Sequence, residues 1–306
     1  MKHLLKMADL SAQEIIEILN LADQLKYETH HGIPHPVLQG KTLGMIFEKA
    51  STRTRVSFEV GMYQLGGNAL FLSARDLQIG RGEPASDTAR VLSRYLDGIM
   101  IRTFAQEEVE TLAEYGSIPI INGLTDYCHP CQVLADLMTI REVKSGLEGL
   151  KLCYIGDGNN MANSLIVGAL KVGMKVSAAT PATDKPHADV MAFAQQFKDF
   201  SWTDSVPDAA EGADVLITDV WASMGQESEA AERAARFEGF QINRQLMEKA
   251  AKDCMVLHCL PAHLGEEITK EVFDAHAGEI FEEAENRLHA QKAVLVRLLG
   301  GKTTVR

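Results

Sequence analysis

The chain has 306 residues, of which 46% are hydrophobic and 24% charged, and its formal net charge is -12. This length exceeds the size at which a single hydrophobic core usually stops growing, so we expect two domains. The composition excludes a disordered or fibrous protein, and the negative charge has the wrong sign for a surface that binds nucleic acid through its phosphates.

The N-terminal residues, the apolar runs and the cysteines indicate the cellular compartment. The first nine residues lack the apolar core of a signal peptide, and no apolar run is long enough to span a membrane. The five cysteines are odd in number and unevenly spaced, which favours a reducing compartment over a disulfide scaffold. We expect a cytoplasmic protein without a membrane or nucleic-acid partner.

Strands and helices alternate through the first half of the chain. Ser11 to Glu14 forms a capping box in front of the first helix. After a loop at residues 32–36, the alternation is typical of a parallel sheet wound with helices. We expect strands at 42–47, 68–72, 98–102 and 118–121, and helices at 55–65, 87–96, 106–115 and 129–143.

Residues 144–149 contain two glycines and are the candidate hinge. The same alternation restarts beyond them. We expect strands at 152–155, 175–179, 214–218 and 255–258, and helices at 163–172, 188–197, 243–250 and 285–299. The predicted fold class is therefore α/β, with two domains that are each a parallel sheet with helices on both faces, joined by long helices. The domains are 1–143 and 144–284, and the last helix, about 285–306, is expected to pack on the first.

The segment Ser51-Thr52-Arg53-Thr54-Arg55 carries the strongest functional pattern. The free N–H groups and positive dipole end of a helix start attract anions, hydroxyls add donors, and an arginine offers a planar fork for phosphate oxygens. An ordinary helix cap explains one hydroxyl, but not three interleaved with two arginines. The glycines and the Lys-Ser/Thr pair of a Walker loop are absent. The segment predicts a different kind of phosphate site.

Phe47-Glu48-Lys49 followed by Ser51 to Arg55 resembles the carbamoyl phosphate signature of the aspartate/ornithine carbamoyltransferase family, and the resemblance covers nearly the whole chain. Ala50 stands where many relatives have proline, a variation that a loop tolerates. The family binds carbamoyl phosphate in its N-terminal domain. The resemblance implies that the residues binding carbamoyl phosphate are Ser51, Thr52, Arg53, Thr54, Gln78, Arg102, His129, Gln132, Cys259, Leu260 and Arg287.

The resemblance also implies individual roles. Arg102, His129 and Thr54 would hold the carbonyl oxygen of carbamoyl phosphate, and Gln132 would contact its amino group. Together with Cys259, the first three are the predicted catalytic residues. A lone histidine is more often a cap or a packed polar residue, but His129 precedes a proline at a helix start, where side chains point toward the strand ends.

Gln78 matches a family glutamine that reaches into the neighbouring subunit's site, which implies a homotrimer with shared active sites. Cys128 and Cys131 have a Cys-x-x-Cys spacing that suggests zinc or redox chemistry. A single such pair is weak evidence for a metal, so we expect no metal and no cofactor.

The C-terminal half determines the second substrate. Gly156-Asp157-Gly158 follows a strand and resembles part of a dinucleotide fingerprint, but Met161 replaces the third glycine and no acid ends the next strand. The stretch 219–225 instead resembles the mobile loop of the ornithine branch of the family, and His258 to Pro261 agrees with that branch. An aspartate-specific member would show a Pro-Leu-Arg-type segment there. The implied ornithine-binding residues are Asn160, Asp219, Ser223 and Met224.

The expected reaction is transfer of the carbamoyl group to the δ-amine of L-ornithine, giving L-citrulline and phosphate in arginine and citrulline metabolism. Alternative functions are a nicotinamide oxidoreductase and an exported two-lobed binding protein, for which a signal peptide is lacking. Putrescine, N-acetylornithine or another amine is the alternative acceptor. For Cys259, the alternative role is that of a small buried hydrophobe. The sequence leaves open the physiological direction and any assembly beyond a trimer.

Overall fold

The computed structural model describes residues 1–222 and 229–300. It contains two compact units, Met1–Ala135 with Asn286–Arg306, and Asp136–Glu285. The unit boundaries fall inside two long helices, α5 (Pro130–Lys144) and α12 (Ala277–Leu299), so each of these helices contributes residues to both units.

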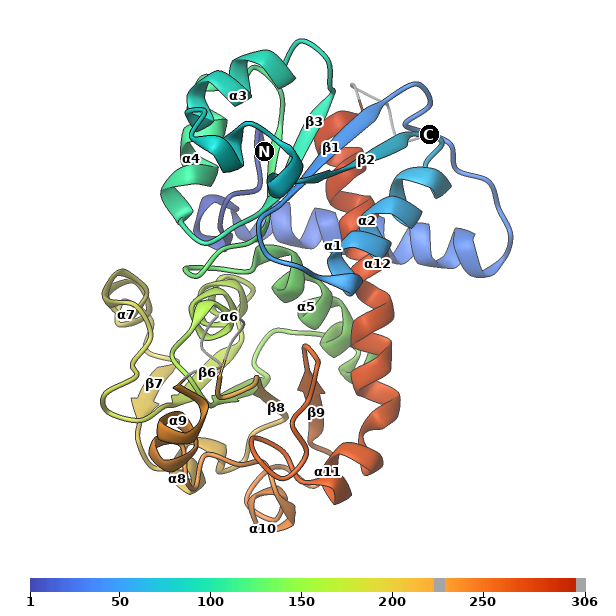
Figure 1. Ribbon diagram of the computed structural model, residues 1–306. Helices are drawn as coiled ribbons and strands as arrows, with labels where there is room; N and C mark the ends of the chain where they lie inside the picture. Colours follow the sequence, from blue (N-terminus) through green and yellow to red (C-terminus); the bar gives the residue numbers. More distant parts are fainter. Residues whose placement is uncertain (223–228, 301–306) are drawn as a thin grey trace. The chain divides into compact units, whose positions relative to one another are not determined.

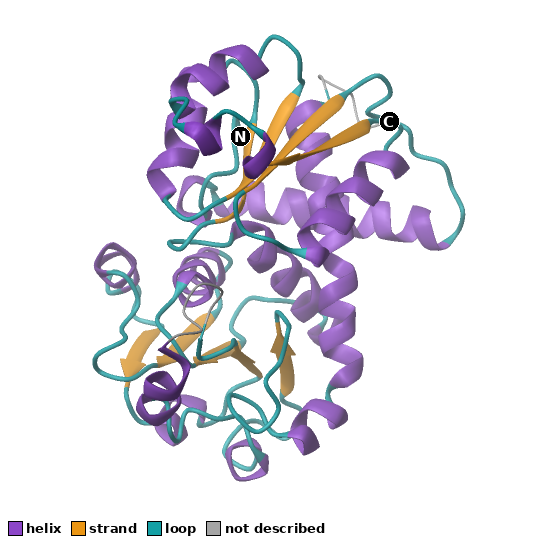
Figure 2. Ribbon diagram, viewed as in Figure 1, coloured by secondary structure: helices purple, strands orange, loops and turns teal. Residues whose placement is uncertain are grey.

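The first unit contains a four-stranded parallel sheet in the order β2-β1-β3-β4 (Figures 1 and 2). Leu4 adds a parallel bridge to Ile121 beside β4. The strands are β1 (Thr42–Phe47), β2 (Asn68–Ser73), β3 (Gly98–Arg102) and β4 (Ile120–Leu124). The helices are η1 (Met7–Asp9), α1 (Ala12–His30), α2 (Thr52–Gln64), η2 (Ala74–Asp76), η3 (Ile79–Arg81), α3 (Ala85–Leu92) and α4 (Gln106–Tyr115).

Helices cover both faces of this sheet. Ile46 and Ile101 point to one face, where they pack with Leu112 of α4 and other buried apolar residues. Gly98 points to the opposite face, where an added Cβ would lie 3.0 Å from Leu299 of α12. Figure 1 shows α3 and α4 on one side of the strands and α2 and α12 on the other. In open α/β sheets of this kind, ligands bind at the carboxyl ends of the strands.

The second unit contains a five-stranded parallel sheet in the order β7-β6-β5-β8-β9. Its strands are β5 (Lys151–Ile155), β6 (Lys175–Ala179), β7 (Phe200–Thr203), β8 (Val215–Thr218) and β9 (Met255–His258). Its helices are α6 (Asn160–Lys171), α7 (Ala188–Ala194), α8 (Val206–Ala210), α9 (Ala230–Arg236), α10 (Arg244–Met247) and α11 (Lys270–Ala275). The predicted α/β class with two parallel sheets is confirmed.

Most predicted elements are present, and the differences lie at their ends. Helix α2 begins at Thr52 rather than residue 55, because the Ser51 hydroxyl caps it by accepting from the Thr54 N–H at 3.2 Å. The strand predicted at 118–121 is shifted to β4, and α12 starts at Ala277, before the predicted 285. The edge strand β7 was not predicted. Within the described ranges, no helix has the length and apolarity needed to cross a membrane.

Candidate active site

The predicted phosphate segment lies where β1 ends and α2 begins. Ser51 is the N-cap, and Arg53 and Thr54 occupy the first helical turn, so their side chains lie at the positive end of the helix dipole. The loop before the helix is tied to the end of the next strand, since the N–H groups of Glu48 and Lys49 point to the carbonyl oxygen of Arg102 at 2.9 and 3.4 Å. The segment and Arg102 are therefore held together at the carboxyl edge of the sheet.

His129 is the focus of a cationic cluster at this edge. Its imidazole is buried, and its pKa is lowered well below the usual value, first by burial and then by the charges of Arg287, Arg102 and Arg53. Three arginines that act on one imidazole must lie near it in space, although they come from α12, β3 and α2. The ring is therefore neutral at physiological pH, and the positive charge of the cluster belongs to the arginines.

Arg287 joins three elements at the cluster. Its guanidinium donates to the side-chain oxygens of Gln132 at 2.7 Å and Thr54 at 3.2 Å, and all three residues are almost completely buried. Burying a charged group is costly unless its donors are satisfied, so these hydrogen bonds fix the guanidinium in place. The structure thus brings together seven predicted residues: Ser51, Arg53, Thr54, Arg102, His129, Gln132 and Arg287.

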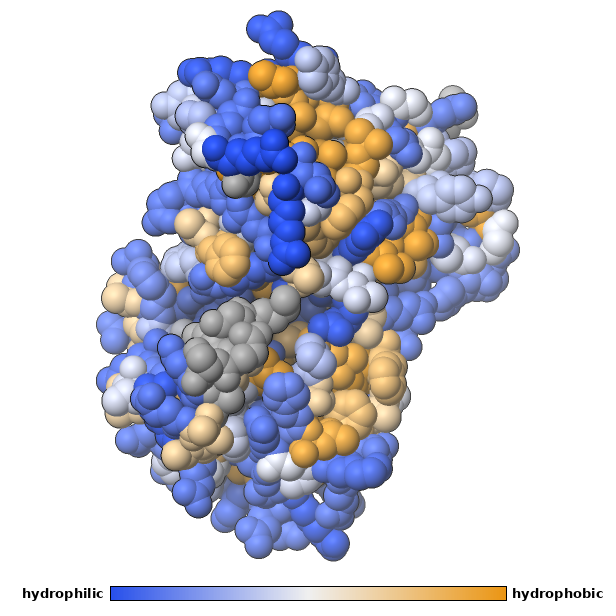
Figure 3. Space-filling view, in the orientation of Figure 1, coloured by the Kyte–Doolittle hydropathy of each residue, from blue (hydrophilic) through white to orange (hydrophobic). Residues whose placement is uncertain are grey.

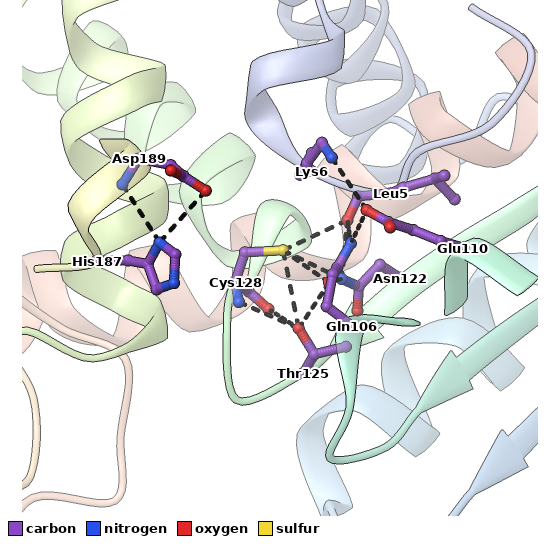
Figure 4. A network of polar contacts seen from close by, with 9 residues as sticks. All are labelled: Leu5, Lys6, Gln106, Glu110, Asn122, Thr125, Cys128, His187 and Asp189. Carbon is purple, nitrogen blue, oxygen red and sulfur yellow. Dashed lines mark hydrogen bonds and ion pairs between the residues drawn. The ribbon is translucent and has the colours of Figure 1, made fainter. Parts of the chain in front are cut away.

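Figure 4 shows the buried polar network that shapes the turn in front of His129. Thr125 donates to Gln106 Oε1 at 2.9 Å and accepts from the Cys128 N–H at 3.1 Å, while Asn122 donates to the carbonyl oxygen of Leu5 at 2.8 Å. Cys128 Sγ lies within this network, 3.4 Å from Gln106 Oε1. The network connects β4, α4 and the N-terminal segment, so it fixes the backbone that carries His129.

Cys128 and Cys131 are packed, protonated thiols of this network. Both are buried, and burial raises the pKa of each thiol to about 12. Both thiols are therefore protonated in this packed environment, where they can act as weak donors. Cys131 Sγ donates to the carbonyl oxygen of Asn122 at 3.3 Å.

Other predicted residues of the first unit have different surroundings. Thr52 is exposed, and Arg55 stacks on Phe71 at 3.7 Å and pairs with Glu59 at 3.1 Å. Of the two arginines in the segment, Arg53 therefore belongs to the cluster around His129, and Arg55 pairs elsewhere. Gln78 is exposed, and its carbonyl oxygen accepts from the N–H of Arg81 at 2.8 Å.

The depressed pKa of His129 has a measurable consequence for stability. The native imidazole is neutral, whereas in the unfolded chain it takes up a proton below about pH 6.5. Below that pH the unfolded state binds the extra proton, so native stability falls by up to about 1.4 kcal/mol per pH unit. We expect the denaturation midpoint to fall less between pH 7 and pH 5 in His129→Asn than in the wild type. Parallel pH profiles for the two proteins would contradict a neutral, buried ring.

The candidate second-substrate site in the second unit is built around the buried Asp219, which follows β8. Its two carboxylate oxygens accept from Asn159 Nδ2 at 2.9 Å, the Val220 N–H at 2.8 Å and Cys259 Sγ at 3.1 Å. Asn159 also caps α6 by accepting from the N–H of Met161 at 2.9 Å. Asp219 is therefore held rigidly at the carboxyl edge of the second sheet, beside a helix start.

Cys259 is a hydrogen-bond donor rather than a nucleophile in this arrangement. Burial and the carboxylates of Asp219 and Glu283 raise the pKa of its thiol well above the usual range. The next residue, Leu260, has a left-handed backbone conformation with φ of 58°, and its N–H donates to His258 Nδ1 at 2.9 Å. The turn after β9 is thereby fixed with Cys259 toward Asp219.

The side chain of His258 stabilises this turn through both of its ring nitrogens. Since Nδ1 accepts, Nε2 carries the proton and donates to the buried carboxylate of Glu267 at 2.9 Å. His263 and Glu266 lie beside Glu267, with three possible ligand atoms within 4.8 Å of one another. Glu267 Oε1 accepts from His258 and from the His263 N–H at 2.6 Å, so this carboxylate holds the two ends of the turn together.

Gly158 provides direct evidence against a dinucleotide site. A Cβ added there would lie 2.2 Å from the carbonyl carbon of Lys185, and its N–H donates to the carbonyl oxygen of Asp184 at 2.9 Å. In a dinucleotide fingerprint, the second glycine lets the pyrophosphate approach the backbone. Here the chain's own loop occupies that position.

The remaining predicted ornithine residues are distributed differently. Asn160 is the first residue of α6, next to the capping Asn159. Ser223 and Met224 lie outside the described residues. Sequence reasoning did not select Asn159, although an asparagine just before a helix is a recognisable cap signal. It also missed Arg233, which ion-pairs with Asp157 and donates to the carbonyl oxygen of Trp221 at 2.5 Å.

Two family patterns match the chain. The carbamoyl-P binding domain of aspartate/ornithine carbamoyltransferase matches residues 2–142, and the Asp/Orn binding domain of the same family matches residues 148–298. Together they cover nearly all of the sequence. The chain therefore belongs to the aspartate/ornithine carbamoyltransferase family.

Relatives within this family narrow the assignment. An ornithine carbamoyltransferase from Carboxydothermus hydrogenoformans is 57% identical over 97% of both chains, and one from Thermococcus kodakarensis is 51% identical over 98% of this chain and 97% of its own length. The solved structure of the Pyrococcus furiosus ornithine carbamoyltransferase superposes with a TM-score of 0.94, at 50% identity over 99% of this chain and 98% of that one. The similarity is to the ornithine branch of the family.

Proposed function

We propose that this chain transfers the carbamoyl group of carbamoyl phosphate to the δ-amine of L-ornithine, giving L-citrulline and phosphate. Membership of the family makes the chain a carbamoyltransferase, and the relatives named above are ornithine carbamoyltransferases. The observation that carries the proposal is the cluster of Arg53, Arg102 and Arg287 around the neutral His129. The reaction belongs to arginine and citrulline metabolism, and to arginine biosynthesis in the direction of citrulline.

The cluster suits the chemistry of an acyl phosphate. The uncharged amine attacks the carbonyl carbon, the new C–N bond forms, and the C–O bond to phosphate breaks with its electrons passing to the phosphate. Arg102, His129 and Thr54 would stabilise the oxyanion, at roughly 3 kcal/mol for each well-placed donor. Arg53 and the start of α2 would hold the departing phosphate, which can accept the amine proton. This displacement involves no change of oxidation state and needs no redox cofactor.

The acceptor is assigned from Asp219. A buried carboxylate attracts a cationic amino acid, and the ordered Asn159 and Cys259 around it keep it aimed at one place. Asn160, Ser223 and Met224 complete the proposed ornithine contacts, whereas Leu260 and Cys259 remain proposed contacts of carbamoyl phosphate. In this proposal, residues 1–143 and the helix 285–306 bind carbamoyl phosphate, and residues 144–284 bind ornithine.

We further propose a homotrimer in the cytoplasm, with Gln78 of one subunit reaching the site of the next. Figure 3 shows hydrophobic residues gathered over β2 and α2, where Val56, Tyr63, Leu70 and Phe71 are exposed in the single chain. Contiguous exposed apolar surface on an otherwise soluble fold favours a subunit interface. All five cysteines are free thiols, in keeping with a reducing compartment. Light scattering should give about three times the 33.6 kDa chain mass.

An amine panel tests the proposed function. Purified protein is given carbamoyl phosphate with ornithine, putrescine, N-acetylornithine, lysine or aspartate, and released phosphate and carbamoylated product are measured. We expect ornithine to exceed every other amine in kcat/KM by at least about tenfold, because the Asp219 site recognises a cationic amino acid. A faster reaction with aspartate, or NADH binding without phosphate release, would refute the assignment.

A further inference from the structure

Two helices each place a pair of polar residues one turn apart beside the cationic cluster. Arg53 and Ser57 lie on α2, and Arg287 and Gln291 lie on α12. Residues four positions apart share a helix face, so each pair presents two side chains to the same neighbour. Ser57 Oγ and the Gln291 amide are 2.5 Å apart, which joins the two faces.

The direction of the hydrogen bonds at this contact is determined by the single proton of Ser57. Its hydroxyl donates to the carbonyl oxygen of Arg53 at 2.6 Å, so it must accept from Gln291. The amide nitrogen of Gln291 therefore faces Ser57, and the amide oxygen faces Arg287, where it accepts from Nε at 3.0 Å and Nη2 at 2.8 Å. A continuous series of hydrogen bonds therefore connects Arg287 through Gln291 and Ser57 to the backbone of Arg53.

This series of hydrogen bonds fixes the orientation of the Arg287 guanidinium, which is part of the cationic cluster. Gln132 and Thr54 hold the tips of the Arg287 guanidinium, and Gln291, which is fully buried, holds its Nε edge. These three partners belong to α2, α5 and α12, and together they determine the plane of the Arg287 guanidinium. The other end of this series of hydrogen bonds is the carbonyl oxygen of Arg53, in the first turn of α2.

We propose that Gln291 and Ser57 are positioning residues for carbamoyl phosphate: they set the plane of the Arg287 guanidinium and couple it to the helix start at Arg53. The proposal rests on the proposed function, since it assigns the cluster to carbamoyl phosphate. Neither residue touches the ligand in this assignment. Both act through arginines that do.

Ser57→Ala and Gln291→Leu each remove the hydrogen bond between Ser57 and Gln291, one from the α2 side and the other from the α12 side. We expect each to raise the KM for carbamoyl phosphate about tenfold, with the KM for ornithine unchanged, because only the anion-binding side is disturbed. The double variant should be no worse than either single variant, since both remove the same link. Gln291→Glu keeps an acceptor for Arg287 but offers no N–H to Ser57, and its KM should match that of Ser57→Ala.

Thr29→Val is the matched control. The Thr29 hydroxyl donates to the Leu25 carbonyl oxygen at 2.7 Å and accepts from Lys292 of α12 at 2.6 Å, the same arrangement on α1. This variant should lower the melting temperature and leave both KM values unchanged. If it raises the KM for carbamoyl phosphate as much as Ser57→Ala does, the effect is general loosening of α12 and the proposal fails.

The proposal also fails if Ser57→Ala and Gln291→Glu bind carbamoyl phosphate like the wild type. Ser57→Ala keeps the test decisive if Gln291→Leu does not fold, because alanine is the best helix former and Ser57 is only half-buried. A wild-type protein that forms no citrulline would instead refute the proposed function. Binding of carbamoyl phosphate alone, measured by calorimetry, then still tests the positioning role.

Discussion

Arg53→Gln is expected to reduce kcat/KM for carbamoyl phosphate by roughly a hundredfold to more than ten-thousandfold. The variant removes a charge at the helix start, where Arg53 lies near His129 with Arg102 and Arg287. Hydrogen bonds from a charged donor are each worth roughly 1.5–3 kcal/mol, and a guanidinium can make two with one phosphate. The loss should appear in steady-state assays at saturating ornithine, with an unchanged circular dichroism spectrum.

Arg55→Gln is the control for this variant, because it makes the same charge change two residues away. Arg55 stacks on Phe71 and pairs with Glu59 rather than joining the cluster. We expect its kcat/KM to stay within about twofold of the wild type, as is usual for an exposed ion pair. An equal loss in both variants would mean that net positive charge matters rather than the position of Arg53.

The local patterns that defined the elements were readable from the sequence because they obey short-range rules. The capping box at Ser11 and Glu14 is present, with the Glu14 N–H donating to Ser11 Oγ at 3.1 Å. The buried strands β1, β3, β6 and β9 have their predicted bounds. The edge strand β7 was missed because its half-buried residues carry no continuous apolar run.

Contacts between distant segments could not be read in the same way. The convergence of Arg53, Arg102 and Arg287 on His129 depends on the order of strands in the sheet and on the return of α12 to the first unit. Sequence spacing placed Arg55 with Arg53, but α2 begins three residues earlier than predicted and turns Arg55 toward Phe71. The grouping of these residues into one site was predicted from the resemblance to a family and not from the periodicity of the sequence.

Asp219→Asn is expected to raise the KM for ornithine by at least about a hundredfold while leaving the affinity for carbamoyl phosphate unchanged. The variant removes the buried negative charge that we propose pairs with the amino acid, a loss of roughly 3 kcal/mol or more. It also places an amide nitrogen against one of the donors Asn159, Val220 and Cys259, which now contact two carboxylate oxygens. Ornithine saturation curves and calorimetry with carbamoyl phosphate measure the two effects separately.

Asp274→Asn is the matched control, because it neutralises another carboxylate of the second unit, one that is exposed and pairs with Lys270 at 2.5 Å. We expect its KM for ornithine to change less than about threefold, as for a peripheral ion pair. Equal loss of affinity for both substrates in Asp219→Asn would show that the two units are misassigned.

Cys259→Ser separates the two roles that Asp219 can have. The serine hydroxyl keeps a donor to the carboxylate that now accepts from Cys259 Sγ at 3.1 Å. If Asp219 recognises the amine directly, this variant should cost far less ornithine affinity than Asp219→Asn, because the charge remains. If Asp219 served only to hold the thiol against the substrate, the two variants would lose ornithine affinity equally, and the cation-binding role would pass to another group.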